Sequence, residues 1–362
     1  MSVIHLDKRG MYMKQNDKKI FGGINGLKAL SCFGIIAMHI LANTQLAVTG
    51  LLKEVIMSWT QLVYLFLILS AFGMCCGYFS RFQAQKIDIN FFYKRRYSKM
   101  LPFFMFLVLI AIIIEHTKFS LYEGLIELTL LFGLLPNNNL GVLGVSWTLG
   151  VIFVFYFLFP FFTYLLADKT RAWISFIVTL GINYLCTIYF FSDKFVASNF
   201  VARHTFIYCT PFFMLGGILF LYKEKILVLV RKLGILFLSF CCLVTVLYYI
   251  IPDHFIGINI FIFKQLVILT LWLLYAIGSD SKILNSKVLK LFSNISMEMY
   301  LAQMIVFRII QRLNLLYVLG NGLLSFVFIF VIEIIGLVAF IEGYKWFVVQ
   351  FSKIFKIRKL SI

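Results

Sequence analysis

Long apolar segments follow one another along almost the whole chain and restrict what it can fold into more than any other feature. A membrane-spanning helix takes about 20 residues. Ten segments approach or exceed that length, at residues 24–48, 57–79, 100–116, 145–167, 172–191, 204–222, 233–251, 256–277, 291–313 and 322–344. Only 13% of the residues are charged, against about 25% in soluble proteins. The sequence therefore predicts an all-α integral membrane protein with about ten transmembrane helices, and it excludes a soluble enzyme, a disordered chain and a coiled coil.

One apolar segment is too short for a span. Residues 121–135 include Glu123 and Glu127 and precede Pro136 and three asparagines. Fifteen helical residues cover only about 22 Å, less than the roughly 30 Å of a hydrocarbon core. We therefore expect a short interfacial or re-entrant helix near 121–135.

Positive charge is unevenly distributed between the segments that connect the predicted spans. With the N-terminus in the cytoplasm, 25 of the 33 Lys and Arg residues fall in inside segments. The outside segments contain Lys53, Lys118, Lys194 and Arg203. Cytoplasmic loops are enriched in Lys and Arg, so this distribution favours ten spans with both termini cytoplasmic. The net charge of +18 is then explained without a nucleic-acid partner.

These boundaries predict three parts: a basic cytoplasmic tail at 1–23, a ten-helix domain at 24–344 and a basic cytoplasmic tail at 345–362. The expected partner is the lipid bilayer, and the expected location is the plasma membrane, as a multi-pass protein. None of the seven cysteines forms a CxxC pair, so neither a disulfide framework nor a metal site is expected.

Ionisable residues inside the first predicted span are candidates for chemistry. Lys28 and His39 are eleven residues apart, so both project from one helix face about 16 Å apart. Burying an ionisable side chain in hydrocarbon is costly, which makes each a functional hypothesis. The structural alternatives are that Lys28 extends to the inner headgroups and that His39 bonds a neighbouring helix.

Further charged residues lie in and between the later spans. Arg95, Arg96 and Lys99 belong to a basic segment just before Pro102, which we expect to open the next helix. The segment is either an ordinary topogenic loop or a cytoplasmic anion site. Glu298 and Glu333 lie within predicted spans, and an ion pair of Glu333 with Lys264 or Arg308 is a structural alternative to a role in the reaction.

Several segments, in order along nearly the whole chain, resemble the acyltransferase family 3 membrane proteins. Asn25–Leu30 followed by His39 is similar to the family's "D-G-L-R-A-L-A" helix and its catalytic histidine. The other matching segments are Phe66–Phe72 ("F-F-V-L-S-G-F"), Phe92–Pro102 ("R-x-x-R-x-x-P"), Trp147–Pro160 ("W-S-L-S-V-E-x-x-F-Y-L-L-F-P"), Phe212–Gly216 and Ile295–Leu301.

The resemblance implies transfer of an acyl group, most simply acetyl, from cytoplasmic acyl-CoA to a hydroxyl of a cell-surface glycan or its lipid-linked precursor. No permanently bound cofactor is implied. It also implies that His39 is catalytic, as general base or through an acyl-imidazole. The residues implied to bind donor or acceptor are Asn25, Lys28, Ser70, Arg95, Arg96, Lys99, Trp147, Tyr156 and Tyr300.

The chain departs from the family pattern at several positions. Asn25, Lys28, Lys99 and Gln303 replace the family's Asp, Arg, Arg and His, and Ile152 replaces its glutamate. Three interpretations of the missing acid stay open: substitution by Glu115, Glu123 or Glu127, a purely structural role of the family glutamate, or a weak or inactive member. The rival function is a non-catalytic or transport-type membrane protein, such as a glycan exporter.

Overall fold

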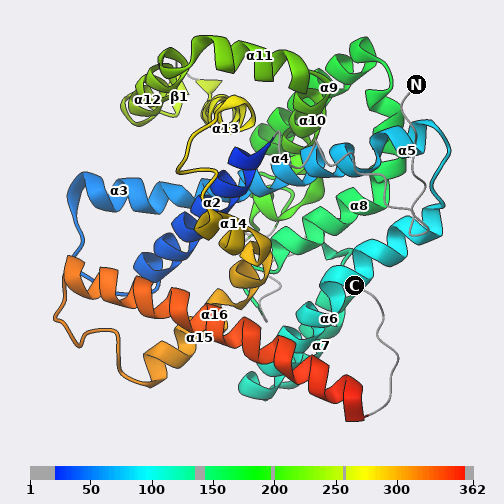
Figure 1. Ribbon diagram of the computed structural model, residues 1–362. Helices are drawn as coiled ribbons and strands as arrows, with labels where there is room; N and C mark the ends of the chain where they lie inside the picture. The colour runs from blue at the N-terminus through cyan, green and yellow to red at the C-terminus, as the bar shows by residue number, and fades with distance from the viewer. Residues whose placement is uncertain (1–20, 135–142, 197–199, 256–257, 355–362) are drawn as a thin grey trace. The chain divides into compact units, whose positions relative to one another are not determined.

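The computed structural model describes residues 21–134, 143–196, 200–255 and 258–354, and within them nearly all regular structure is helical (Figure 1). Seven helices of this part are long and apolar enough to cross a membrane, or eight if the bent pair α11 (Lys223–Leu233) and α12 (Ile235–Ile250) forms one span. The prediction of an all-α multi-pass membrane protein is confirmed. Two further predicted spans coincide with shorter helices, α10 (Phe206–Leu221) and α15 (Ser296–Arg312). The count of ten spans and the cytoplasmic termini therefore stay predictions.

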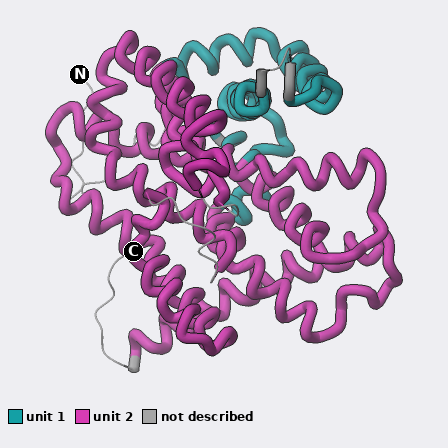
Figure 2. The backbone as a smooth tube through the Cα atoms, turned by 180° about the vertical axis from the view of Figure 1, so that it is seen from behind, with its two compact units in different colours: residues 1–27, 222–293 teal, residues 28–221, 294–362 magenta. Residues whose placement is uncertain are grey.

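The chain divides into two compact units (Figure 2). Residues 1–27 and 222–293 belong to the first unit, and residues 28–221 and 294–362 to the second. The described elements of the first unit, besides the start of α2, are α11, α12, β1 (His254–Phe255), β2 (Ile258–Asn259), α13 (Phe261–Gly278) and α14 (Lys287–Asn294).

The second unit contains most of the helices. Its described elements are α2 (Gly22–Ala42) from Lys28 onward, α3 (Gly50–Ser58), η1 (Trp59–Gln61), α4 (Leu62–Met74), η2 (Cys75–Phe79), α5 (Ser80–Gln83), α6 (Ile89–Glu115), α7 (Lys118–Leu128), η3 (Phe132–Leu134), α8 (Trp147–Leu166), α9 (Lys169–Leu185), η4 (Cys186–Phe190), η5 (Ala202–His204), α10, α15 and α16 (Leu323–Ile354). Helix α16 continues past residue 344, so the predicted start of the C-terminal tail falls inside it.

Helices α4, α8 and α10 form the core of the second unit. The rings of Tyr64 and Phe212 stack with centroids 4.2 Å apart, and those of Phe155 and Phe213 stack at the same separation. Gly216 of α10 lies against the backbone of α4, where a side chain would overlap a carbonyl group. Close helix approach through small residues is typical of packing in membranes, and it fixes the helices that carry the candidate site.

Helix α6 begins earlier than the hydropathy predicts. The Asp88 carboxylate accepts hydrogen bonds from the backbone N–H groups of Asn90 and Phe91, so the helix starts at Ile89. The expectation that the basic segment is a loop and that Pro102 opens the helix is wrong, because Pro102 lies inside α6. A proline removes only one helical hydrogen bond, and membrane helices tolerate this loss.

The predicted short helix corresponds to α7, which has 11 residues. Thr117 and Ser120 form a reciprocal capping box at its start, and His116 with φ 51° separates it from α6. Eleven residues cover about 16 Å, which confirms a helix too short to cross the bilayer. Its placement at the interface stays a prediction, and residues 135–142 lie outside the described part.

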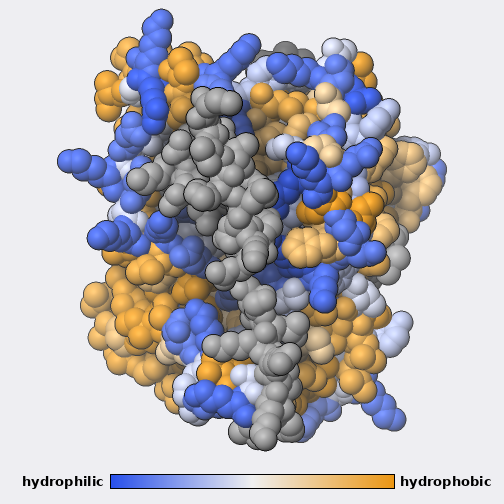
Figure 3. All heavy atoms as spheres, turned by 45° about the vertical axis from the view of Figure 1, so that its right-hand side comes forward, coloured by the Kyte–Doolittle hydropathy of each residue, from blue (hydrophilic) through white to orange (hydrophobic). Residues whose placement is uncertain are grey.

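Apolar side chains make up a broad part of the surface (Figure 3). On α9, Ile174, Ile177 and Val178 are each more than half exposed, at 57%, 63% and 53%. Exposed large apolar side chains in such number are suited to contact with lipid rather than water. They support the membrane assignment independently of hydropathy.

Candidate active site

A cavity of about 200 Å³ in the second unit contains the predicted catalytic histidine. Segments that are far apart in the sequence line it: α2, η1 with the start of α4, the start of α8 with the segment before it, η5 with the residue before it, and α15. The residues are Ile35, Met38, His39, Thr60, Val63, Gly144, Trp147, Val201, Arg203, His204 and Tyr300. Three of the predicted site residues, His39, Trp147 and Tyr300, are therefore brought together.

His39 lies near the end of α2, one turn before the helix terminates at Ala42. The backbone carbonyl of His39 accepts a hydrogen bond of 2.8 Å from the Asn43 side chain, which caps the C-terminal end of the helix. Its imidazole is partly accessible and lies within electrostatic range of Arg203. The ring is thus available to a molecule in the cavity.

The short helix η5 supplies Arg203 and His204. Nη1 of Arg203 donates to the Thr60 hydroxyl at 3.1 Å, and its guanidinium lies 5.8 Å from the centre of the Trp147 ring. The His204 ring stacks on Trp147 with centroids 4.5 Å apart. Burial and the neighbouring positive charge of Arg203 lower the pKa of His204 to about 3. His204 is therefore a neutral imidazole at physiological pH.

Tyr300 and Thr148 form a hydrogen-bonded wall of the cavity. The Tyr300 hydroxyl donates to the Val145 carbonyl at 3.3 Å and lies 2.7 Å from the Thr148 hydroxyl. Because the single tyrosine proton is used on Val145, Thr148 is the donor of the shorter bond. This arrangement ties α15 to the first turn of α8 and to the segment before it.

Glu127 of α7 is held against the start of α8. The Ser146 hydroxyl donates to its Oε1 atom at 2.7 Å, while Oε2 is buried without a hydrogen-bond partner. Burial raises the pKa of Glu127 to about 7 despite the opposing hydrogen bond from Ser146.

Of the acids considered as substitutes at Ile152, Glu127 contacts the residue directly before Trp147, whereas Glu115 pairs with Arg308 at 3.3 Å. Glu123 is a buried neighbour of Glu127 on the same helix.

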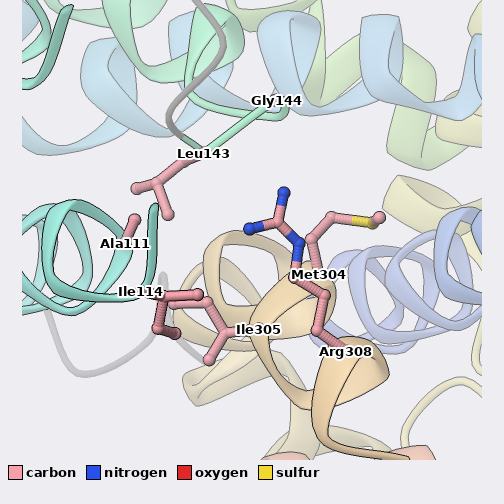
Figure 4. Close-up of a pocket in the computed structure, with 7 residues that line it drawn as sticks. All are labelled: Ala111, Ile114, Leu143, Gly144, Met304, Ile305 and Arg308. Carbon is pink, nitrogen blue, oxygen red and sulfur yellow. The ribbon is translucent and has the colours of Figure 1, made fainter. Parts of the chain in front are cut away.

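A smaller cavity of about 70 Å³ adjoins this region (Figure 4). Its side chains come from α6, from α15 and from Leu143, and Arg308 extends toward the backbone at Leu143 and Gly144. Gly144, with φ 55°, lines both cavities. The two cavities therefore share a wall that consists of backbone at this residue.

A second cluster of predicted site residues forms around Arg96. Its guanidinium lies 4.5 Å from the Tyr78 ring and 5.6 Å from the Tyr156 ring, and Nε is buried without a hydrogen-bond partner. The Ser70 hydroxyl donates to that of Tyr156 at 3.4 Å. Arg96, Ser70 and Tyr156 are therefore brought together.

The remaining predicted cations and Glu298 are arranged around the same end of the second unit. Arg95 and Lys99 are exposed on α6. Lys28 interacts electrostatically with Lys99 and Glu298. None of these residues lines the cavity that holds His39. Asn25 belongs to the first unit, where its side-chain oxygen accepts a bond of 3.3 Å from Ser293.

The sequence left open an ion pair of Glu333 with Lys264 or Arg308, and among the described residues both cations pair with other acids. Lys264 pairs with Asp253 at 2.7 Å, and Arg308 pairs with Glu115. Both cations lie near helix ends, where acids of adjoining segments reach them, whereas Glu333 is buried in the middle of α16 with Oε2 unpartnered. Within the described residues, no three His, Cys, Asp or Glu side chains are grouped so as to hold a metal ion.

Thr60, Arg203 and His204 line the cavity but were not among the residues singled out from the sequence. One signal was present: Arg203 is the sole arginine of the predicted outside segments, and a histidine follows it directly. An arginine beside a histidine in predicted outside segments, which hold few cations, is more informative than the same pair in a basic loop.

Comparison with protein-family models gives one match: a model described as an acyltransferase domain covers residues 21–342. Comparisons with curated proteins and with solved structures gave no match. The matched range includes His39, Arg203, Trp147 and Tyr300 as well as the cluster around Arg96. The chain therefore belongs to the acyltransferase 3 family and is a membrane acyltransferase.

Proposed function

We propose that the protein transfers an acyl group, most simply acetyl, from cytoplasmic acyl-CoA to a hydroxyl group of a cell-surface or exported glycan, or of its lipid-linked precursor, in a bacterial plasma membrane. The observation that carries this proposal is the placement of His39 in a polar cavity together with Arg203, His204 and Tyr300. A histidine accessible to a bound hydroxyl is the side chain best suited to proton transfer near neutral pH.

In the proposed reaction His39 acts as general base. Its imidazole takes the proton of the acceptor hydroxyl while that oxygen attacks the thioester carbonyl carbon. The new C–O bond forms, the C–S bond breaks, and the departing thiolate of CoA takes the proton from the imidazolium. The covalent alternative is an acyl group carried briefly on His39 before the hydroxyl attacks.

The donor is proposed to bind through the cluster around Arg96. Arg96, Arg95 and Lys99 would hold the phosphates of CoA, since guanidinium groups grip phosphate oxygens in pairs. Thr148, Ile152 and Tyr156 follow at four-residue intervals on one face of α8, so that face covers about 12 Å between the two clusters. A thin pantetheine arm fits such a separation.

The test uses membranes that contain the wild-type protein, His39→Ala or His39→Gln, supplied with radiolabelled acetyl-CoA and cell-envelope glycan. Removal of a general base is expected to lower transfer by about 10²–10⁴-fold. His116→Asn is the matched control, because His116 lies outside the cavity and asparagine tolerates its positive φ. Full activity in both His39 variants would overturn the assignment of the base.

The second candidate function is a non-catalytic or transport-type protein, and Ile152 in place of the family's glutamate favours it. Ile152 is an apolar side chain with 1% of its surface exposed, so this position of α8 supplies no acid. Absence of label transfer by the wild-type protein to every envelope glycan would support this function over the enzymatic one.

A further inference from the structure

Arg203 presents an unused hydrogen-bonding edge. Nη1 donates to Thr60, whereas Nε is buried and has no hydrogen-bond partner. In a guanidinium group Nε–H and Nη2–H point the same way, and together they bind two oxygens of one anion. With Nη1 anchored on Thr60, this two-donor edge is held in a fixed orientation. Leaving a buried donor unpaired is costly, so the vacancy favours a ligand.

The charge of Arg203 is also uncompensated. No acidic side chain is among the described residues that line the cavity, and Arg203 forms no ion pair within the described part of the chain. The nearby aromatic group is the Trp147 ring, at 5.8 Å from the guanidinium carbon. A cavity wall that contains a cation and no acid attracts an anion.

We infer that this cavity binds an anionic acceptor, with a carboxylate or phosphate group held by Nε and Nη2 of Arg203 beside the hydroxyl that faces His39. The inference rests on the proposed function and deepens it, because it names the chemical class of the acceptor. A carboxylate and a phosphate share the feature that the edge recognises, namely two oxygens about as far apart as the two donors.

An oxyanion that develops during acyl transfer is the alternative occupant. It is a single oxygen that can accept from both donors, but it exists only while the reaction proceeds. A two-oxygen anion satisfies both donors, and its binding does not depend on the reaction. The two roles therefore differ in a measurable way: an anionic acceptor requires Arg203 for binding, whereas an oxyanion requires it for turnover of every acceptor.

The experiment measures binding to the full chain in nanodiscs of zwitterionic lipid by titration calorimetry at low ionic strength. The probes are three matched sugars: methyl glucuronoside, methyl glucoside and methyl glucoside 6-phosphate. The wild-type protein is expected to bind one or both anionic probes about ten- to a hundredfold more tightly than the neutral one. Comparing the glucuronoside with the 6-phosphate shows whether the cavity prefers a carboxylate or a phosphate.

Variants locate the effect. Arg203→Gln is expected to abolish the preference, so that the anionic probes bind no more tightly than methyl glucoside. Arg203→Lys keeps the charge but lacks the paired donors, so it is expected to retain only part of the preference. Lys194→Gln is the matched control, because Lys194 is an exposed cation outside the cavity.

Equal wild-type binding of the neutral and anionic probes would overturn the inference. It would also be overturned if Arg203→Gln retained the preference, or if that variant slowed acyl transfer to neutral and anionic acceptors equally, which is the signature of an oxyanion role. If Arg203→Gln does not fold, Arg203→Lys decides: a reduced preference supports the inference, and an unchanged preference overturns it. Because binding is measured without acyl-CoA, charge-selective binding through Arg203 would stand even if no acyl transfer occurred, and the two proposals fail separately.

Discussion

Replacement of Glu127 by glutamine is expected to change how the stability of the protein depends on pH. The side chain is fully buried on α7, and burial raises its pKa to about 7 from an ordinary 4.5. Between pH 4.5 and 7 the folded protein therefore holds a proton that the unfolded chain has released, so stability falls as pH rises through this window. At about 1.36 kcal/mol per pH unit, the unfolding free energy falls by about 3 kcal/mol across this pH window.

Glutamine cannot ionise, and its oxygen still accepts a bond from Ser146. The unfolding free energy of Glu127→Gln relative to wild type is thus expected to rise by about 3 kcal/mol between pH 4.5 and pH 8. The difference between the two proteins is the relevant quantity, because His204 titrates with the opposite sign: its pKa of about 3 makes stability fall as pH decreases from 6.5 toward 3.

The measurement is reversible unfolding by sodium dodecyl sulfate in mixed micelles at pH 4.5, 6, 7 and 8, followed by tryptophan fluorescence. Glu54→Gln is the control, because Glu54 is an exposed acid on α3. A difference between Glu127→Gln and wild type that stays constant across this pH range would refute the reasoning. It would mean that the Glu127 carboxylate is ionised in the folded protein at low pH and is compensated by contacts other than that from Ser146.

Three further outcomes are expected. Gly216→Ala forces α10 away from the α4 backbone and is expected to lower the unfolding free energy by about 1–3 kcal/mol. Gly73→Ala is the control, because its added Cβ meets nothing within 4 Å and is expected to have little effect. Equal unfolding midpoints of the two variants would contradict this prediction. Asp88→Ala removes the cap of α6 and is expected to cost about 1 kcal/mol in the same assay. His204→Phe keeps an aromatic ring against the indole of Trp147. Because the pKa of His204 is about 3, this variant is expected to leave the pH profile of acyl transfer unchanged between pH 5 and 8. A shift of either side of that pH profile would show that His204 titrates in the reaction.

Hydropathy predicted where helices lie but not where they begin. Each predicted span overlaps a helix of the structure, because a run of apolar residues in lipid has few alternatives to a helix. The start of α6 was missed, since Lys94, Arg95 and Arg96 are helical without being apolar and the boundary is set by one capping carboxylate, Asp88. Helix continuation beyond the apolar region leaves no mark in hydropathy.

The candidate site was predictable where one helix carries it and not where tertiary contacts build it. His39 could be found from its helical spacing to Lys28. Arg203 lies in a three-residue helix with no periodicity, and its partner Thr60 comes from a distant segment. The partners of Lys264 and Arg308, which are Asp253 and Glu115, could not be chosen from the sequence, because pairing depends on which helix ends meet and sequence order does not contain that information.

The wall at Gly144 makes the two cavities interdependent in size. Because the same backbone faces both cavities, a shift of Gly144 that enlarges the space beside His39 is expected to narrow the space next to Arg308. The segment is anchored at Ser146 by Glu127, and that anchor changes its charge near neutral pH. Ionisation of Glu127 is therefore expected to act on the backbone wall that the two cavities share, through the hydroxyl of Ser146.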